Sequence, residues 1–143
     1  MASRNFTTYT RALLSAQVNM TTATVKTMLV SSVPTESNFD TWAFRSDVTN
    51  EISGTGYTTG GISQPFTLDA LDTAGNRQTV TYTNIPSAWT SSSFSAVGSI
   101  QYIDTGSSAT SRVIGFSDFG GTQTVSSGSF DLTYTSSAAV TAV

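Results

Sequence analysis

The chain has 143 residues, six Lys or Arg against nine Asp or Glu, and a formal net charge of −3. It contains no cysteine and no histidine, which excludes disulfides, thiolate metal sites and the Ser-His and Cys-His catalytic pairs. The cations are scattered, whereas nucleic-acid binding needs them clustered on one face, and no apolar run approaches the ~20 residues of a membrane-spanning helix. We therefore expect neither a nucleic-acid nor a membrane partner.

Hydroxyl side chains take the place of charge in this chain. Only 10% of the residues are charged, against roughly 25% in average soluble domains, while Ser and Thr number 23 and 26. Such a surface suits a protein packed against other copies of itself or against partners. Threonine is also a strand former, so the same composition fits simple β-propensity, and both interpretations stay open.

Residues 5–16 form the one convincing helix pattern, and Asn5 can cap its first turn. The apolar residues of this segment recur at i, i+3, i+7 and i+8 and share one helical face. That face either covers the end of a β core, which we favour, or contacts a neighbouring subunit. Its residues are Phe6, Tyr9, Leu13 and Leu14.

Strand patterns begin at 23–32, which is rich in β-branched residues. The segment 35–48 is expected to connect strands and to contain a short helical turn, since Ser, Asn and Asp suit turns and caps. Apolar and polar residues then alternate in 65–71 and again in 77–84. With a Gly-containing turn at 72–76 between them, these two runs predict a hairpin.

Further strands follow at short intervals. We expect a loop over 85–93 and then a central strand over 94–104, which is apolar on both faces. Strands are also predicted over 112–120 and 128–137, and the tail 136–143 is either a last edge strand or flexible.

Six or seven short strands with short connections and no βαβ rhythm predict an all-β fold. We expect an antiparallel β-sandwich or jelly-roll-like single domain over residues 1–143, with a short N-terminal helix.

The segment 50–61, NEISGTGYTTGG, has the most unusual composition of the chain. Its glycine spacing differs from the dinucleotide fingerprint, a β pattern and no helix follows it, and no lysine occurs after Lys26 to complete a phosphate-binding loop. We therefore expect a structural loop whose glycines allow positive φ and close backbone approach at bends. Its tyrosine would lie across the edge of the core with a hydrogen-bonded hydroxyl. The residues are Gly54, Gly56, Tyr57, Gly60 and Gly61.

Carboxylates are the best catalytic candidates in the chain. A glycosidase needs two of them about 5 Å or 6.5–9.5 Å apart, and Glu51, Asp104 and Asp118 could supply such a pair. However, Asp72 and Asp104 occur in turn sequences and Asp118 flanks a glycine corner, where Asp binds its own backbone. We expect no enzyme, no cofactor and no metal site, and calcium stays open because it takes oxygen ligands.

Three segments in this order resemble a family of small structural proteins of tailed bacteriophages: ATVKTMLVSS, FDTWAFRSDVTNEISGTGYTTGG and IGFSDFGGTQTVSSGSFDLTY. The resemblance spans about residues 20 to 135, and the central segment is its most specific part. The N-terminal segment departs from the family, whose members often carry more charge there. The matching positions are Val25, Lys26, Leu29, Trp42, Asp47, Val48, Asn50, Glu51, Ser53, Gly54, Gly56, Tyr57, Gly60, Gly61, Ile114, Gly115, Phe116, Asp118, Phe119 and Gly120.

The resemblance implies a non-enzymatic virion protein, foremost a capsid cement or decoration protein that is made in the host bacterial cytoplasm. Its partners would be the major capsid protein, on whose outer surface it would sit, and further copies of itself as a dimer or trimer. The alternative is a module of a tail, head fibre or baseplate, in which aromatic residues could form a sugar-binding platform. That platform would consist of Trp42, Tyr57, Trp89 and Tyr102.

Overall fold

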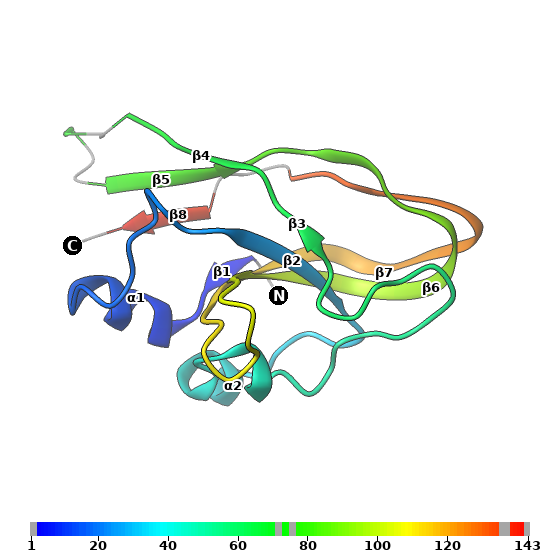
Figure 1. Ribbon diagram of the computed structural model, residues 1–143, viewed down its shortest axis with the longest axis horizontal. Coiled ribbons are helices and arrows are strands. Elements are labelled where there is room, and N and C mark those ends of the chain that lie inside the picture. The colour runs from blue at the N-terminus through cyan, green and yellow to red at the C-terminus, as the bar shows by residue number, and fades with distance from the viewer. Residues whose placement is uncertain (1–2, 71–72, 75–76, 135–137, 142–143) are drawn as a thin grey trace.

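The computed structural model describes residues 3–70, 73–74, 77–134 and 138–141, which form two antiparallel sheets and two short α-helices (Figure 1). The five-stranded sheet has the order β1-β7-β6-β2-β3, and the three-stranded sheet has the order β4-β5-β8. This arrangement confirms the expected all-β class. The elements are β1 (Arg4–Asn5), α1 (Thr7–Leu14), β2 (Val25–Val30), α2 (Glu36–Thr41), the 3-10 helix η1 (Arg45–Asp47), β3 (Ile62–Ser63), β4 (Phe66–Leu68), β5 (Arg77–Tyr82), β6 (Ile85–Ile103), β7 (Val113–Leu132) and β8 (Ala138–Thr141).

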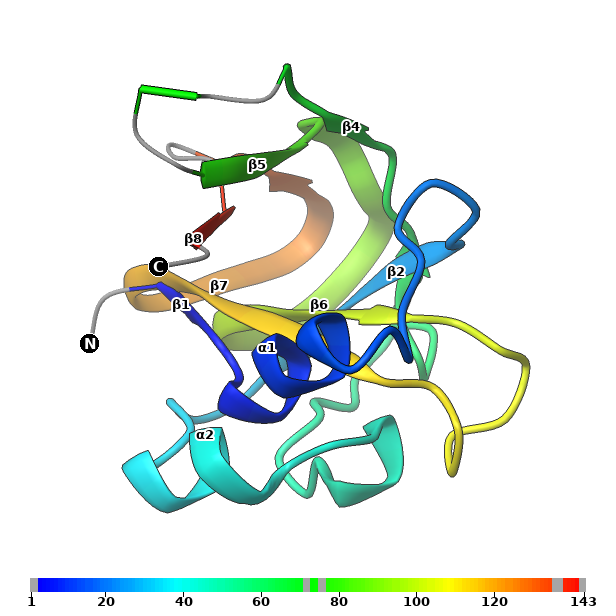
Figure 2. The same cartoon turned by 90° about the vertical axis from the view of Figure 1, so that its left-hand side faces the viewer.

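The larger sheet lies between the helices and the smaller sheet (Figure 2). Met28, Ile100 and Phe116 are register partners on adjacent strands, so their side chains share one face of the sheet. On that face the Phe116 ring lies 6.2 Å from Phe39 of α2, and Phe39 lies 5.0 Å from Phe6 at the start of α1. All five side chains are buried, so the helices cover this face with an aromatic core.

The opposite face of the larger sheet carries a buried polar network. The Gln101 amide donates to the hydroxyls of Thr27 (3.1 Å) and Tyr134 (3.4 Å), and the Tyr134 hydroxyl donates to Gln64 (2.7 Å). The ring of Tyr134 lies 5.4 Å from that of Tyr82 in β5, so the network reaches the smaller sheet. Because a buried amide without partners costs about 1–3 kcal/mol, these bonds favour one relative position of the two sheets.

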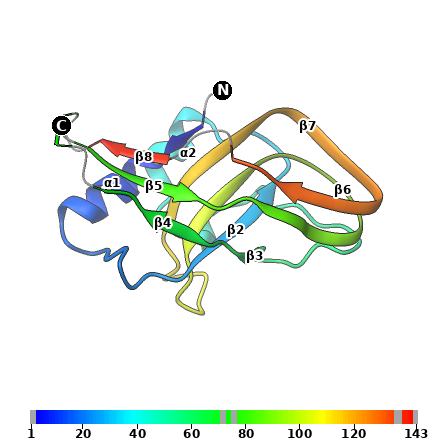
Figure 3. The ribbon, with the colours of Figure 1, turned by 90° about the horizontal axis from the view of Figure 1, so that it is seen from above.

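The longest strands correct three boundaries predicted from the sequence. Residues 85–93 do not form a loop but belong to β6, and the strands expected over 112–120 and 128–137 are largely one strand, β7. β6 and β7 pair along almost their whole length and bend together (Figure 3).

Irregular pairing explains the error in these boundaries. The ladder between β6 and β7 has five register shifts, and bulges of this kind bend a strand without ending it. Ser87, Ser91 and Ser127 adopt positive φ within the two strands, and Gly120 and Gly121 do so at the corner of β7. In the sequence these Ser- and Gly-rich stretches have the composition of loops, and only the tertiary pairing makes them strands.

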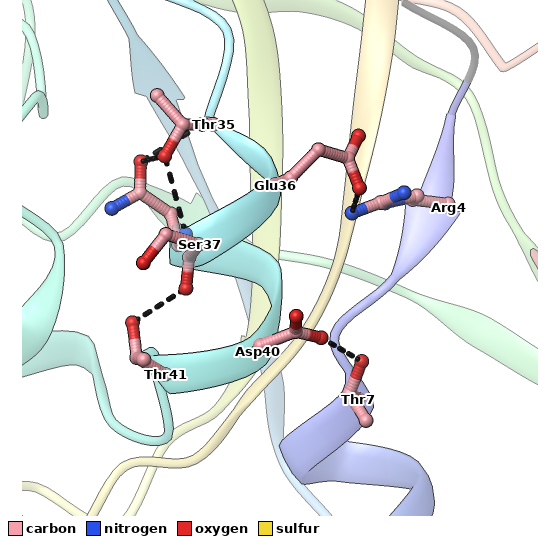
Figure 4. Close-up of polar contacts among 8 residues, drawn as sticks. Arg4, Thr7, Thr35, Glu36, Ser37, Asp40 and Thr41 are labelled. Atoms are coloured by element: carbon pink, nitrogen blue, oxygen red, sulfur yellow. Dashed lines mark hydrogen bonds and ion pairs between the residues drawn. The ribbon is translucent and has the colours of Figure 1, made fainter.

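The N-terminal helix is shorter than the predicted 5–16, and Asn5 does not cap it. Asn5 belongs to β1, where it pairs with Gly115, and Phe6 occupies the position before the helix without a side-chain cap. Contacts with α2 hold the start of the helix and the preceding strand instead (Figure 4): Thr7 of α1 donates to Asp40 at 2.9 Å, and Arg4 of β1 pairs with Glu36 at 2.8 Å.

The two ends of the smaller sheet agree with the sequence where they are described. β4 and β5 pair as the predicted hairpin, although part of its turn at 72–76 lies outside the described residues. In the predicted tail 136–143, residues 138–141 form β8 and pair with β5 as an edge strand, while the rest of that range lies outside the described residues.

Candidate functional site

The glycine-rich segment 50–61 runs along the part of the outer edge of β2 that β3 does not cover. Its main chain pairs with the strand through Ser31 N–H to Asn50 O (2.9 Å) and Ile52 N–H to Leu29 O (3.0 Å). The next strand N–H, of Leu29, donates to the side-chain hydroxyl of Tyr57 at 3.1 Å. The Tyr57 hydroxyl therefore takes the place of a carbonyl on a neighbouring strand, and no unpaired donor is left at this point of the edge.

The ring of Tyr57 joins this edge to the bent part of β6. It lies 5.4 Å from the ring of Trp89 and 5.7 Å from that of Phe94, measured between centroids. These three rings, with Leu29 and Phe130, belong to one apolar cluster beneath the bend. The tilted and edge-on geometries are those that aromatic pairs prefer.

Glu51 is the acidic centre of the segment, and its carboxylate is already engaged. It accepts from the Tyr57 hydroxyl at 2.9 Å and from Gly60 N–H at 2.5 Å, and it pairs with Arg45 of η1 at 3.5 Å. Tyr102 of β6 donates to Gly60 O at 2.6 Å, and its ring lies 5.6 Å from the Arg45 guanidinium. The Glu51 side chain is only 16% exposed, so this network ties η1, the loop and β6 together.

The electrostatics of Tyr57 follow from this arrangement. Burial raises the pKa of its hydroxyl well above the ordinary value, and the adjacent Glu51 carboxylate raises this pKa further. The phenol therefore stays protonated and donates a hydrogen bond to the Glu51 carboxylate. It is a structural donor and not a base.

Close approach and backbone conformation account for the glycines of the segment. Gly61 has φ +72°, and a Cβ there would lie 1.7 Å from the carbonyl oxygen of Thr27. Gly56 has φ +78°, and a Cβ would lie 2.6 Å from the Ser92 hydroxyl oxygen. Gly60 also has positive φ, while at Gly54 a Cβ would collide with β6.

Several main-chain N–H groups of the loop are engaged within the chain and are not available to a phosphate. A phosphate-binding cradle needs free main-chain N–H groups. Here Tyr57 N–H donates to Gly54 O, Gly61 N–H donates to Thr58 O, and Gly60 N–H donates to Glu51. These donors are satisfied inside the chain.

The carboxylates considered for hydrolysis occupy separate structural roles. Asp104 accepts from Gly106 N–H at 3.1 Å and pairs with Lys26 at 2.9 Å, which lowers the pKa of Asp104. Asp118 accepts from Gly120 N–H at 2.8 Å at the corner of β7. The turn role expected for both aspartates is thus confirmed. Within the described part of the chain, no three acidic side chains gather where they could hold a metal ion.

The aromatic platform considered for sugar binding is not present at the surface. Trp42, Trp89 and Tyr102 are only 8%, 3% and 1% exposed, and each packs inside an apolar cluster. Tyr57 is half-buried. A platform needs exposed ring faces, so this prediction was wrong: packing against two sheets uses the faces that a sugar would need.

The helical face predicted from the sequence divides into two parts. Phe6 and Tyr9 are fully buried in the core of this chain, Leu13 is half-buried, and Leu14 is 79% exposed. The buried pair covers the end of the β core between α2 and the sheets. Contact with a neighbouring subunit stays a prediction, and Leu14 is the member of the set that is available for it.

Two features of this region were not found from the sequence. Arg45 is one of the cations scattered along the sequence, and the structure pairs it with Glu51. The second is a hollow of about 460 Å³ along the bend of β7, lined among others by Phe119, Gln123 and Phe130. The sequence signal for the Arg45–Glu51 pair was a single acidic residue in an otherwise charge-free glycine segment. No sequence signal indicates the hollow.

Comparisons of the chain with protein-family models, with curated proteins and with solved structures gave no match. No helix in the described ranges combines the length and apolar character that crossing a membrane requires.

Proposed function

We propose that this chain is a non-enzymatic structural protein of a tailed-bacteriophage virion. It acts as a cement or decoration protein that binds, as a dimer or trimer, to the outer surface of the major capsid protein shell. The observation that carries the proposal concerns segment 50–61, the part of the chain with the most specific family resemblance. Its only acidic residue, its tyrosine and four of its main-chain N–H groups, those of Ile52, Tyr57, Gly60 and Gly61, make contacts that hold the fold together.

The positions of the resemblance support this proposal. The first segment lies in β2, and the second runs from the end of α2 through η1 into the loop along the edge of β2. The third spans nearly all of β7, and β6 lies between β2 and β7. They therefore form the centre of the larger sheet together with its edge. A resemblance concentrated on residues that hold the scaffold suits a family whose members share a shape and not a reaction.

The surface of the bent β6–β7 ribbon supports an adhesive role. The two strands contain no cation and only two acidic residues. Polar contact over a large area, repeated on a symmetric shell, gives strong binding without any single strong contact. The exposed hydroxyl residues of the ribbon are Ser87, Thr90, Ser91, Ser93, Ser95, Thr122, Thr124, Ser126, Ser127 and Ser129.

Purified particles of a phage that encodes the chain provide the test. Mass spectrometry should detect the protein in amounts comparable to the major capsid protein, and electron microscopy should place it on the shell. Labelling on the tail or at the baseplate would favour the alternative module. Its absence from the particles would contradict both.

A further inference from the structure

The second half of β7, residues 123–132, has an unpaired edge. On one side it pairs with β6, and β1 on the other side pairs only with Gly115 and Phe116 of the first half. No hydrogen bond connects the main chain of 123–132 to any described segment other than β6. Six of its ten residues are exposed, so the edge faces solvent within the described part of the chain.

This edge lacks most of the features that normally prevent strand pairing. Natural edge strands are short, carry Lys or Pro, contain β-bulges, or are covered by another segment. Of these features the segment 123–132 has the bulges of its pairing with β6, which leave Gln123, Thr124 and Val125 in regular register. β1, β3 and β4 are edges of only two or three residues. The segment 123–132 is much longer, and its sequence QTVSSGSFDL contains neither Lys nor Pro. Such an edge is a template for an additional strand.

A hollow beside the same edge can receive a side chain of that strand. It has a volume of about 460 Å³ and is lined by both halves of the bent strand. Phe119 and Phe130 contribute their rings, whose centroids lie 6.0 Å apart, and the Phe119 ring is half-buried. Recognition by strand addition combines main-chain hydrogen bonds with pockets for alternate side chains, and this edge has both elements.

The charge of the edge indicates the chemistry of the added strand. β6 and β7 contain no Lys or Arg, and the acidic side chain of Asp131 lines the hollow. Asp131 is exposed. An incoming segment with Lys or Arg complements this field, whereas a second copy of β7 would bring a further carboxylate and no cation.

We propose that β7 binds an extended, basic segment of a partner protein by strand addition along residues 123–132. The inference rests on the proposed function for the identity of the partner, the capsid protein. The binding chemistry itself follows from the edge, the hollow and the charge. The contact would fix the orientation of this chain on its partner, because main-chain pairing sets a register.

The test uses the full ¹⁵N-labelled chain and two synthetic decapeptides, (Thr-Lys)5 and (Thr-Glu)5. Amide chemical shifts and hydrogen exchange are followed during titration. We expect the lysine peptide to shift and slow the exchange of alternate amides within 123–132, and the glutamate peptide to leave them unchanged. Absence of these changes, equal changes with both peptides, or changes centred elsewhere would overturn the inference. So would protection of the edge that rises with protein concentration alone, because it would identify a second copy as the occupant.

Two pairs of variants sharpen the experiment. Asp131→Asn keeps an acceptor for Ser87 N–H but removes the charge, and it should weaken binding of the lysine peptide by about two- to fivefold. Asp40→Asn, on the exposed side of α2, is the matched control and should leave the affinity unchanged. Equal affinities of the two variants would count against the charge argument.

The second pair, Gln123→Pro and Thr124→Pro, changes neighbouring exposed residues whose N–H groups point to opposite edges. Proline at the position whose N–H pairs with β6 should lower the melting temperature, whereas proline at the position whose N–H points to the open edge should not. The variant with the unchanged melting temperature has therefore lost an N–H of the open edge, and it should bind the lysine peptide at least tenfold more weakly. Undiminished binding in that variant would overturn strand addition. If neither variant folds, the exchange pattern of the wild-type chain still decides.

Peptide binding and particle location are independent readouts. A lysine peptide that protects the edge of a protein absent from virions would retain the strand-addition inference and remove the capsid partner. A protein present on the capsid whose edge the lysine peptide does not protect would retain the proposed function and remove the strand-addition inference.

Discussion

The Glu51 carboxylate receives two hydrogen bonds and one ion pair within a mostly buried pocket of the loop. Arg45 is the guanidinium that balances its charge, and the Arg45 side chain is itself only 24% exposed. A charge in such a position is stabilising only while its partner is present. The residue therefore matters more to the fold than a surface acid of the same type.

We expect Glu51→Gln to lower the free energy of unfolding by about 1–3 kcal/mol, because the amide leaves Arg45 without its counter-charge and cannot accept as strongly from Tyr57 and Gly60. Urea unfolding followed by tryptophan fluorescence measures the change. The matched control is Glu36→Gln, which breaks the exposed ion pair with Arg4 and should cost less than about 1 kcal/mol. Equal losses in the two variants would contradict the role given to Glu51.

The glycines of the loop differ from glycines elsewhere in the space around them. Gly61 and Gly106 both have positive φ, +72° and +85°. A Cβ at Gly61 would collide with the main chain of β2, whereas nothing lies within 4 Å of a Cβ at Gly106.

Gly61→Ala should therefore cost about 3 kcal/mol or more, since overpacking adds to backbone strain, and Gly106→Ala only about 1–2 kcal/mol from strain alone. Thermal unfolding of both variants under the same conditions gives the comparison. Similar melting temperatures would show that the approach of the loop to β2 is less close than described.

Helix α1 shows how an element can present one face to its own core and still leave a residue free. Phe6 and Tyr9 lie in the core, while Leu14 at the helix end is exposed. The Ser15 hydroxyl and N–H donate to Arg11 O, so the helix ends within this chain without help from a partner.

We expect Leu14→Ser to leave the melting temperature unchanged and Phe6→Ala to lower the stability by about 3–5 kcal/mol, because only the second creates a cavity. Light scattering on the Leu14 variant then tests the predicted subunit contact. A loss of oligomers in a variant of unchanged stability would support that contact. An unchanged oligomer would remove Leu14 from the interface.

Because the tyrosines are buried in the fold, the protein should lose stability at alkaline pH. All five have raised pKa values, chiefly because they are buried, and those of Tyr9 and Tyr102 reach about 12. A group whose pKa is raised on folding holds its proton more tightly in the folded state. Its stabilising contribution is complete below the unfolded pKa of 10.0 and is lost as pH rises toward the folded value.

Stability should consequently be flat to about pH 9.5 and fall steeply between about pH 10 and 12. Absorbance at 295 nm and circular dichroism, recorded on the same samples, check this expectation. Tyrosine ionisation and loss of structure should occur in one transition. Gradual ionisation near pH 10 in a protein that keeps its circular dichroism would contradict the burial of these residues.

Local chemistry was enough to predict the all-β class, the hairpin of β4 and β5, a helix near the N-terminus and the turn roles of Asp104 and Asp118. These features depend on alternation, helical spacing and side chains that bind their own backbone, all of which act over a few residues. The sequence also set the glycine segment apart, because several glycines around one aromatic residue are seldom needed except where the chain bends or approaches another strand.

Long-range contacts decided the rest. Because β6 and β7 pair through bulges, Ser-rich stretches that resemble loops form strands. Asn5 does not cap the helix because its main chain pairs with Gly115 in β1. Burial of Trp42, Trp89 and Tyr102 removed the sugar platform, and the meeting of Arg45 with Glu51 depends on η1 folding against the loop. Each of these outcomes joins residues distant in sequence, and the free energy that selects them comes from packing and hydrogen bonds absent until the sheets have assembled.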